Sequence, residues 1–247
     1  RNNKNMKKKL IILSETTGIE VMSKLAKNKI ELKYCPAYII ESIDIRLKPS
    51  NNDVIIIFQS KNSVKHSKQI VEPLIERGGI TMYAVGKYSA DEAEATYNNE
   101  CIYPKSNYSS ESVIELLKDI KESHNKFIII KGEGGRNTIE EFLSTRRADV
   151  TSLDVYRRII KKDFFKVTDL NMNSENWLLI SSKELLKKVN IIIKGFDQKF
   201  KICLIVPSKR LIEDKEKSLY KFIKVLPNSI ASPDMILSIV NKDIVNE

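Results

Sequence analysis

The segment 127–158 constrains the fold of this chain more than any other part of the sequence. Residues 127–130 (FIII) are a short run of apolar, β-favouring residues, the pattern of a buried strand. A glycine-rich loop (GEGGR) follows at 132–136, and residues 138–147 then carry apolar residues at helical spacing. Residues 150–156 return to an extended pattern. We therefore predict one strand–helix–strand unit, with exposed backbone N–H groups at the carboxyl end of its first strand.

Short apolar runs followed by a polar loop and a helical pattern recur along the chain. Strands are predicted at 10–13, 54–58, 80–85, 127–130, 177–180, 200–206 and 222–226, and helices at 19–27, 64–71, 90–97, 111–120, 138–147, 184–189, from about 211 to 219 and at 233–240. Pro73 is expected to break or restart its helix. Ser89 is expected to act as an N-cap, and Thr138 with Glu141 as a capping box. Strands that alternate with helices predict an α/β fold.

A faint internal repeat predicts two similar halves. The sequence IIIFQSKNSVKH at 55–66 resembles WLLISSKELLKK at 177–188. Each is an apolar strand, then a serine loop, then a helix that carries lysines. The segments that begin at Met82 and Cys203 pair in the same way, as a strand, a short polar loop and a charged helix.

Two extended segments, at 34–39 and 156–162, predict where the chain crosses between these halves. The expected fold class is therefore α/β, with two doubly wound parallel-sheet domains joined by a two-stranded linker. Residues 1–35 and 161–247 are expected to form the discontinuous domain 1. Residues 38–157 are expected to form domain 2, inserted between the two parts of domain 1.

Charge and cysteine spacing narrow the class of protein. The net charge of +10 favours a polyanionic partner, either nucleic acid or a small molecule rich in carboxylates or phosphates. No run of 18 apolar residues is present, and residues 1–9 are not followed by a signal-type cleavage pattern. Cys35, Cys101 and Cys203 form no CxxC pair, which predicts reduced thiols in a cytoplasmic protein. His66 and His124 are expected to be solvated surface residues.

The predicted strands end in small, hydroxyl-bearing or glycine residues next to a helix start. Six such ends lie at 14–17, 60–63, 86–89, 132–136, 181–182 and 207–210. Free N–H groups at a helix start attract an anion, although serine and threonine there also serve simply as helix caps. The sequence contains no Ser-His-Asp order, no HExxH motif, no Walker lysine loop and no metal-binding cluster.

Several of these segments resemble the uroporphyrinogen-III synthase family. The glycine loop at 132–136 is coupled to the sequence DVYRR at 154–158, as in that family. The segments FQSKNSV at 58–64, AVGKYSA at 84–90, ISS at 180–182 and SKR at 208–210 also resemble family motifs. Gln59 stands where the family usually has threonine, and the first loop lacks the family's Arg-Pro.

The resemblance implies a function and a place for it. It implies that the chain closes the linear tetrapyrrole hydroxymethylbilane to uroporphyrinogen III, with inversion of the last pyrrole ring. This reaction of haem biosynthesis would need no cofactor or metal and would take place in a cleft between the two domains. Tyr156 would assist departure of the terminal hydroxyl, and the alternative is a tyrosine that only packs against the linker. The implied substrate-binding residues are Ser60, Lys61, Asn62, Gly86, Ser89, Gly134, Gly135, Arg136, Ser182, Ser208 and Lys209.

A second class of function stays open at this point. A two-lobed protein that captures an anionic ligand or nucleic acid without chemistry fits the same composition. We expect the enzyme, acting as a monomer on the linear tetrapyrrole, with neither nucleic acid nor membrane as a partner.

Overall fold

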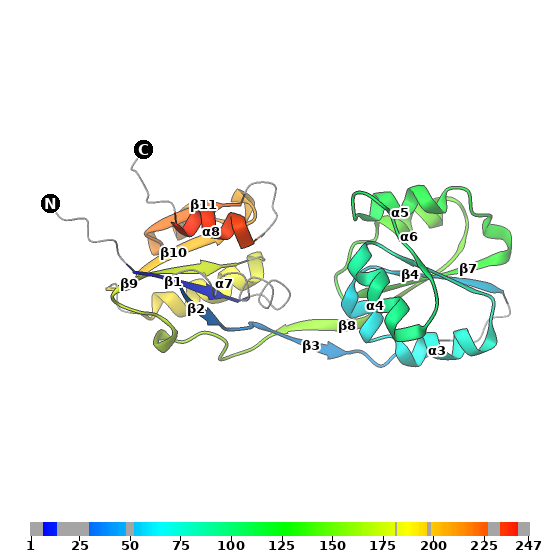
Figure 1. Ribbon diagram of the computed structural model, residues 1–247, viewed down its shortest axis with the longest axis horizontal. Helices are drawn as coiled ribbons and strands as arrows, with labels where there is room; N and C mark the ends of the chain where they lie inside the picture. The colour runs from blue at the N-terminus through cyan, green and yellow to red at the C-terminus, as the bar shows by residue number, and fades with distance from the viewer. Residues whose placement is uncertain are drawn as a thin grey trace. The chain divides into compact units, whose positions relative to one another are not determined.

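The computed structural model describes residues 7–13, 30–47, 52–180, 182–196, 199–226 and 233–241, with the backbone alone at 123, 233–235 and 241 (Figure 1). The loop expected at 14–17, the helix expected at 19–27 and Ser181 lie outside the described residues. The chain forms two compact units, which are Arg1–Ile39 with Ile160–Glu247 (unit 1) and Ile40–Ile159 (unit 2). That these units are the independent domains expected at 1–35 with 161–247 and at 38–157 stays a prediction.

Unit 2 is built on a six-stranded sheet with the order β3-β8-β7-β4-β5-β6. Its strands are β4 Asp53–Phe58, β5 Ile80–Ala84, β6 Cys101–Ile102 and β7 Asn125–Gly132, together with β3 Tyr38–Ser42 and β8 Asp149–Ile160. The last two continue into unit 1, to which Tyr38, Ile39 and Ile160 belong. The strands from β4 to β8 pair in parallel. Edge strand β3 runs antiparallel to β8, because Ile43 N–H donates to the Val155 carbonyl and Lys161 N–H donates to the Ala37 carbonyl.

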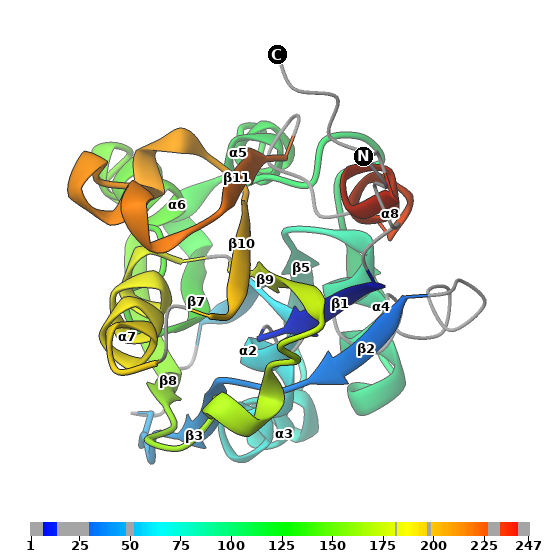
Figure 2. The ribbon, with the colours of Figure 1, turned by 90° about the vertical axis from the view of Figure 1, so that its left-hand side faces the viewer.

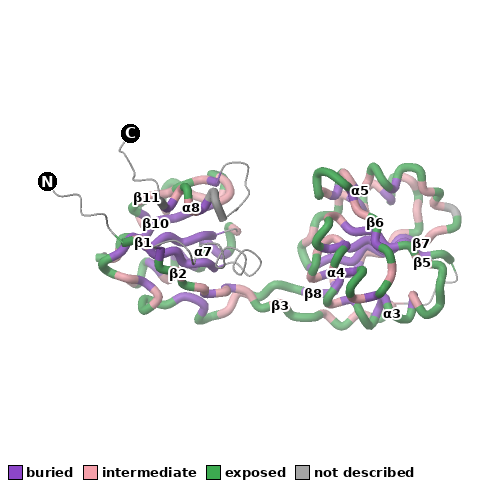
Figure 3. The backbone as a smooth tube through the Cα atoms, viewed as in Figure 1, coloured by how far each residue is buried: buried purple, intermediate pink, exposed green. Residues whose placement is uncertain are grey.

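Helices cover both faces of this sheet. They are α2 Lys61–Lys65, α3 Lys68–Arg77, α4 Lys87–Tyr97, α5 Ser110–Leu117 and α6 Thr138–Thr145, with a 3-10 turn η1 at Glu122–His124. Successive side chains of a strand point to opposite faces, so Ile56 and Phe58 pack with residues of α2, α3 and α4. Ile55 and Ile57 pack on the other face with residues of α5 and α6. A parallel sheet covered in this way is apolar on both faces, and β4 and β7 are mostly buried (Figure 3).

Unit 1 repeats this plan with a five-stranded parallel sheet of order β11-β10-β9-β1-β2. Its elements are β1 Lys7–Ile12, β2 Glu31–Tyr34, β9 Ser174–Leu179, β10 Lys201–Val206, β11 Phe222–Val225, α7 Lys183–Lys194, α8 Pro233–Asn241 and the 3-10 turns η2 Val167–Asp169, η3 Lys209–Leu211 and η4 Asp214–Leu219. Ile11 of β1 packs with residues of α7, and Ile12 packs with residues of α8. These two helices flank the sheet from opposite sides (Figure 2).

Both sheets are doubly wound, which confirms the predicted fold class. The order of strands along the chain reverses between β4 and β7 in unit 2 and between β1 and β9 in unit 1. In open α/β sheets, ligands bind outside the carboxyl ends of the strands at such a switch point. The active-site cleft expected between the two units stays a prediction.

Several local predictions were wrong. Pro73 lies inside α3, and the helix predicted at 64–71 is two helices that are interrupted at His66 and Ser67. The helix predicted to begin at Ala90 begins at Lys87, because Gly86 takes the extended N-cap conformation and the Ser89 N–H already donates to its carbonyl.

One predicted capping box and one predicted helix also differ from the structure. The capping box at Thr138 and Glu141 does not form, because the N-cap of α6 is Asn137 and Thr138 is already the first residue of the helix. The Asn137 side chain accepts a hydrogen bond from Lys131 Nζ instead of capping the helix. The helix predicted from about 211 to 219 is replaced by the turns η3 and η4, which have their own caps at Ser208 and Glu213.

Within the described residues, none of the helices has the length and apolar character that a membrane span requires. The same part of the chain holds no group of three or more His, Cys, Asp and Glu residues placed to bind a metal ion.

The three cysteines generate a prediction. All are buried and free, and burial raises the pKa of Cys35 to about 11 and those of Cys101 and Cys203 to about 12. The thiolate is the reactive form, so at pH 8 the native protein should react with a thiol reagent only slowly. Unfolding in denaturant should expose all three cysteines to the reagent at once. Rapid labelling of any cysteine in the native protein would contradict this placement.

Candidate functional site

Two loops meet at the switch point of unit 2. Gln59 and Ser60 follow β4, and the glycine loop follows the neighbouring strand β7. Gln59 N–H donates to the Ile130 carbonyl at 3.0 Å, and its Nε2 donates to the Arg136 carbonyl at 3.0 Å. These bonds fasten the end of β4 to the loop after β7. The residue that departs from the family pattern therefore has a structural role here.

Tyr156 enters this site from β8. Its side chain is buried, and its hydroxyl oxygen lies 3.1 Å from Ser60 Oγ. Ser60 is the N-cap of α2, and its Oγ also accepts from Ser63 N–H at 3.1 Å. The Ser63 hydroxyl donates in turn to the Ser60 carbonyl at 2.6 Å. Ser60 is thus held by its own helix in a fixed position to meet the phenol.

Gly132 makes room for the Tyr156 ring. A register shift at the end of β7 places Gly132 opposite Tyr156, and Glu133 N–H donates to the Tyr156 carbonyl at 2.8 Å. A Cβ atom at Gly132 would lie 2.7 and 2.8 Å from the Cε2 and Cε1 atoms of the ring. The ring therefore requires glycine at this position. Sequence reasoning missed this role because it treated the loop glycines only as sources of backbone N–H groups.

The Tyr156–Ser60 pair has a hydroxyl proton to spare. Two hydroxyls carry two protons, and only one of them can lie between the two oxygens. Ser60 Oγ uses a lone pair for the Ser63 N–H. Within the described part of the chain, neither hydroxyl makes another hydrogen bond. One O–H donor is therefore left for an acceptor that the described residues do not supply.

Two charged or titratable side chains border the Tyr156 ring. The His66 ring centroid lies 5.7 Å away, and Arg158 Cζ lies 5.9 Å from the ring centroid in a cation–π contact. His66 is partly exposed, which agrees with the surface position expected for it, and its Nδ1 lies 2.7 Å from Ser42 Oγ. Burial, with a smaller effect of Lys65, lowers the pKa of His66, which favours a neutral imidazole beside the phenol.

The glycine loop uses part of its backbone internally. Gly134 has a φ of +73°, which favours glycine, and Gly135 N–H donates to the Gly132 carbonyl at 2.9 Å. The N–H groups of Glu133 and Gly135 are thus engaged, unlike the open N–H row that the sequence predicts. Arg136 is exposed, and Lys131 is buried with its Nζ bonded to Asn137 Oδ1.

The other predicted residues of unit 2 lie at the same edge of the sheet. Lys61 begins α2 and forms an ion pair with Glu92 at 2.9 Å, and Asn62 follows it. Gly86 is the N-cap of α4, where a Cβ atom would lie 2.9 Å from Cβ of Tyr108. Ser89 is buried in the first turn of α4.

The remaining predicted residues belong to unit 1. Ser182 is the N-cap of α7, and its Oγ accepts from Leu185 N–H at 3.1 Å. Ser208 caps η3 through a bond from Arg210 N–H at 3.3 Å, and the exposed Lys209 follows it. These residues follow β9 and β10, at the carboxyl edge of the unit 1 sheet.

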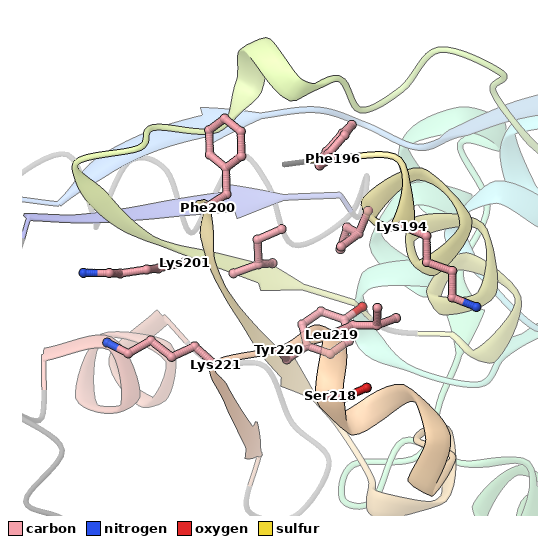
Figure 4. Close-up of a pocket in the computed structure, with 10 residues that line it drawn as sticks. Lys194, Phe196, Phe200, Lys201, Ser218, Leu219, Tyr220 and Lys221 are labelled. Atoms are coloured by element: carbon pink, nitrogen blue, oxygen red, sulfur yellow. The ribbon is translucent and has the colours of Figure 1, made fainter. Parts of the chain in front are cut away.

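A pocket of about 600 Å³ lies at the opposite edge of that sheet. Phe196, Phe200 and Tyr220 line it, near the starts of β10 and β11 (Figure 4). The ammonium groups of Lys201 and Lys221 extend away from these rings. None of the predicted site residues lines this pocket.

The fit between Gly132 and Tyr156 generates a prediction. Gly132→Ala should lower the free energy of unfolding by about 1–3 kcal/mol, because the added methyl group forces the buried ring to move. Urea unfolding measures the change. Gly195→Ala is the matched control, since its Cβ would meet only the Ile192 carbonyl at an ordinary 3.4 Å. Equal stability of Gly132→Ala and wild type would contradict the close approach of the ring.

The chain is similar to one protein family and to solved structures. A family model described as uroporphyrinogen-III synthase HemD matches residues 41–210. The crystal structure of uroporphyrinogen-III synthetase from Helicobacter pylori 26695 has a TM-score of 0.60 at 13% identity, covering 95% of this chain and 99% of that one. A mutant uroporphyrinogen III synthase from the extremely thermophilic bacterium Thermus thermophilus has a TM-score of 0.48 at 11% identity, covering 94% and 97%.

A search of the curated proteins found no match. At 13% identity, the likeness to the Helicobacter pylori structure shows the fold. The family model covers well over half of the chain, including both loops of the unit 2 switch point and Tyr156. The chain therefore belongs to the uroporphyrinogen-III synthase family and is an enzyme of tetrapyrrole biosynthesis.

Proposed function

We propose that this chain closes hydroxymethylbilane to uroporphyrinogen III, with inversion of the last pyrrole ring. The observation that carries the proposal is the Tyr156–Ser60 pair, which has a spare O–H donor at the β4–β7 switch point. Membership of the family makes a linear tetrapyrrole the substrate class that fits this site. Tyr156 is the proposed catalytic residue.

The spare donor suits the first step of this reaction. Departure of the terminal hydroxyl of the bilane as water leaves an azafulvene, and a hydrogen bond from the Tyr156 phenol to that hydroxyl helps it leave. The azafulvene then attacks the substituted carbon of the last pyrrole, and the resulting spiro intermediate fragments and recloses with that ring inverted. The sum is loss of one water, so the reaction needs no redox cofactor.

The rest of the protein's task is to hold a flexible substrate in one shape. The bilane carries many carboxylates, and the chain has a net charge of +10. The proposed substrate-binding residues are Ser60, Lys61, Asn62, Gly86, Ser89, Gly134, Gly135, Arg136, Ser182, Ser208 and Lys209. Arg136 and Lys209 are exposed cations, whereas Lys61 must leave Glu92 or share it. Bringing the two ends of the bilane together supplies proximity.

We propose that loops of both units contact the substrate, that the protein acts as a monomer in the cytoplasm, and that it needs neither cofactor nor metal. Neither nucleic acid nor a membrane is a proposed partner.

The product isomer tests the proposed reaction. Freshly prepared hydroxymethylbilane should be converted to the inverted-ring isomer, because closure without enzyme gives the uninverted ring. Retention of labelled nucleic acid is the counter-assay for the binding-module alternative. Tight binding of tetrapyrrole or nucleic acid with only the uninverted ring as product would overturn the proposal.

Removal of one hydroxyl tests the role of Tyr156. Tyr156→Phe keeps the ring on Gly132 but removes the donor, so turnover should fall by about ten- to a few hundred-fold, on the order of 1.4–3.5 kcal/mol. Steady-state kinetics and thermal unfolding measure the two effects separately. Full activity in this variant would leave Tyr156 with a packing role alone.

Tyr97→Phe is the matched control in the same unit. It removes a buried hydroxyl that lies 3.0 Å from the Val64 carbonyl and from Ser67 Oγ, in the core between α2 and α4. It should lower stability and leave turnover near that of the wild type. Loss of turnover in both variants, in step with loss of stability, would mean that folding rather than catalysis is affected.

Salt dependence tests whether charge holds the substrate. Raising the salt concentration from about 10 mM to about 150 mM shortens the Debye length from about 30 Å to about 8 Å. The KM for the bilane should therefore rise several-fold, with a smaller change in kcat. Sucrose of equal osmolality is the control. A KM that is insensitive to salt would mean that the positive charge does not contribute to binding.

A further inference from the structure

We propose that Tyr38 and Ser182 form a second hydroxyl pair, in unit 1, that binds a carboxylate of the same tetrapyrrole substrate. The proposal rests on the proposed function and adds Tyr38 as a substrate-binding residue. The Tyr38 hydroxyl oxygen lies 2.6 Å from Ser182 Oγ. Both side chains are half-buried, so the pair is fixed but still reachable from solvent.

The pair repeats the arrangement of Tyr156 and Ser60. Ser60 and Ser182 occupy the same position in the internal repeat of 55–66 and 177–188. Each serine is the N-cap of the helix that follows a strand at a switch point, β4 in one unit and β9 in the other. Each Oγ accepts from the N–H three residues further on, at 3.1 Å in both cases.

The two tyrosines also have corresponding positions. Tyr156 lies on β8 and Tyr38 on β3, the two strands through which the chain passes from one unit to the other. A serine that serves only as a helix N-cap does not require a tyrosine hydroxyl beside it. The same combination in both units indicates that each switch point contacts a ligand.

The number of hydroxyl protons in the pair indicates which kind of group it can bind. Ser182 Oγ already accepts from Leu185 N–H, and one hydroxyl proton lies between Ser182 and Tyr38. Across the described ranges, neither hydroxyl makes another hydrogen bond, so one O–H donor is free. An oxygen acceptor fits this donor. Since the proposed substrate carries carboxylates at both ends, a carboxylate oxygen is the acceptor we assign.

The Tyr38 ring does not depend on its hydroxyl for its place. It packs against the apolar cluster of unit 1, which includes Cys35, Ala37 and Leu185. The backbone beside it is also fixed, because Ala37 N–H donates to the Leu13 carbonyl and the Ala37 carbonyl accepts from Lys161 N–H. Phenylalanine should therefore keep the same position, which makes Tyr38→Phe a test of the hydroxyl alone.

Steady-state kinetics with hydroxymethylbilane form the first arm of the test. Tyr38→Phe should raise KM by about ten- to one hundred-fold, the loss of a hydrogen bond to a charged group, with kcat within about two-fold of the wild type. Its midpoint of thermal unfolding should be unchanged. Ser182→Ala combined with Tyr38→Phe should raise KM by less than the product of the single effects, because the two hydroxyls act as one unit. An unchanged KM in an active enzyme would overturn the inference.

Tyr220→Phe is the matched control in unit 1. Its buried hydroxyl donates to Asn190 Oδ1 at 2.5 Å, within the α7 side of the core. This variant should lower the unfolding midpoint and leave KM unchanged. An equal rise in KM for Tyr38→Phe and Tyr220→Phe would mean that a general loosening of unit 1 causes the effect, and would overturn the inference.

Binding of uroporphyrin, measured by fluorescence quenching, forms the second arm and does not require turnover. Uroporphyrin carries the same carboxylates on a closed ring, and its affinity should fall in Tyr38→Phe but not in Tyr220→Phe. If the wild type makes no uroporphyrinogen III yet shows this difference, the proposed reaction fails and the binding role of Tyr38 stands. Equal affinity of the wild type and Tyr38→Phe would overturn the binding role, whatever the activity.

Discussion

The steric fit of the Tyr156 ring on Gly132 is the constraint on which the candidate site depends. A side chain at position 132 would occupy the space of the ring, and the register shift in β7 brings these two residues opposite each other. The fit directs the phenol to Ser60 at the end of β4. The chain order reverses between β4 and β7, and open α/β sheets bind ligands outside the carboxyl ends of the strands at such a point. The donor is therefore placed where an α/β sheet binds its ligands.

The two units each place a serine–tyrosine hydroxyl pair at a helix start, with different sequences. Each has a serine at a helix start, fastened by the N–H three residues later, and each serine meets a tyrosine from a strand of the linker. The hydroxyl pairs differ in length, 2.6 Å in unit 1 and 3.1 Å in unit 2. In our account the unit 2 pair assists chemistry and the unit 1 pair holds substrate, which divides the work between two related structures.

Sequence patterns predicted the strands and their apolar faces well, because parallel strands buried on both sides must be continuous apolar runs. The glycine loop and Tyr156 were also found, because both lie next to such runs. The role of Gly132 was not predicted, because it depends on the side chain of Tyr156, which lies 24 residues further along the sequence. Tyr38 was missed for the same reason: its partner Ser182 is distant in sequence, and only the fold brings them together. The start of α4 was predicted three residues too late, because the helix begins from the extended Gly86, whose carbonyl accepts from the Ser89 N–H.

In the proposed mechanism, the Tyr156 phenol donates a hydrogen bond to the departing hydroxyl. Fluorotyrosines incorporated at position 156 change the acidity of the phenol with little change in its size. Turnover of hydroxymethylbilane should be measured for the series at a pH where every phenol stays protonated. The account predicts that turnover rises as the phenol becomes more acidic, because a stronger donor helps the hydroxyl leave. A turnover that does not depend on the acidity of the phenol would contradict it.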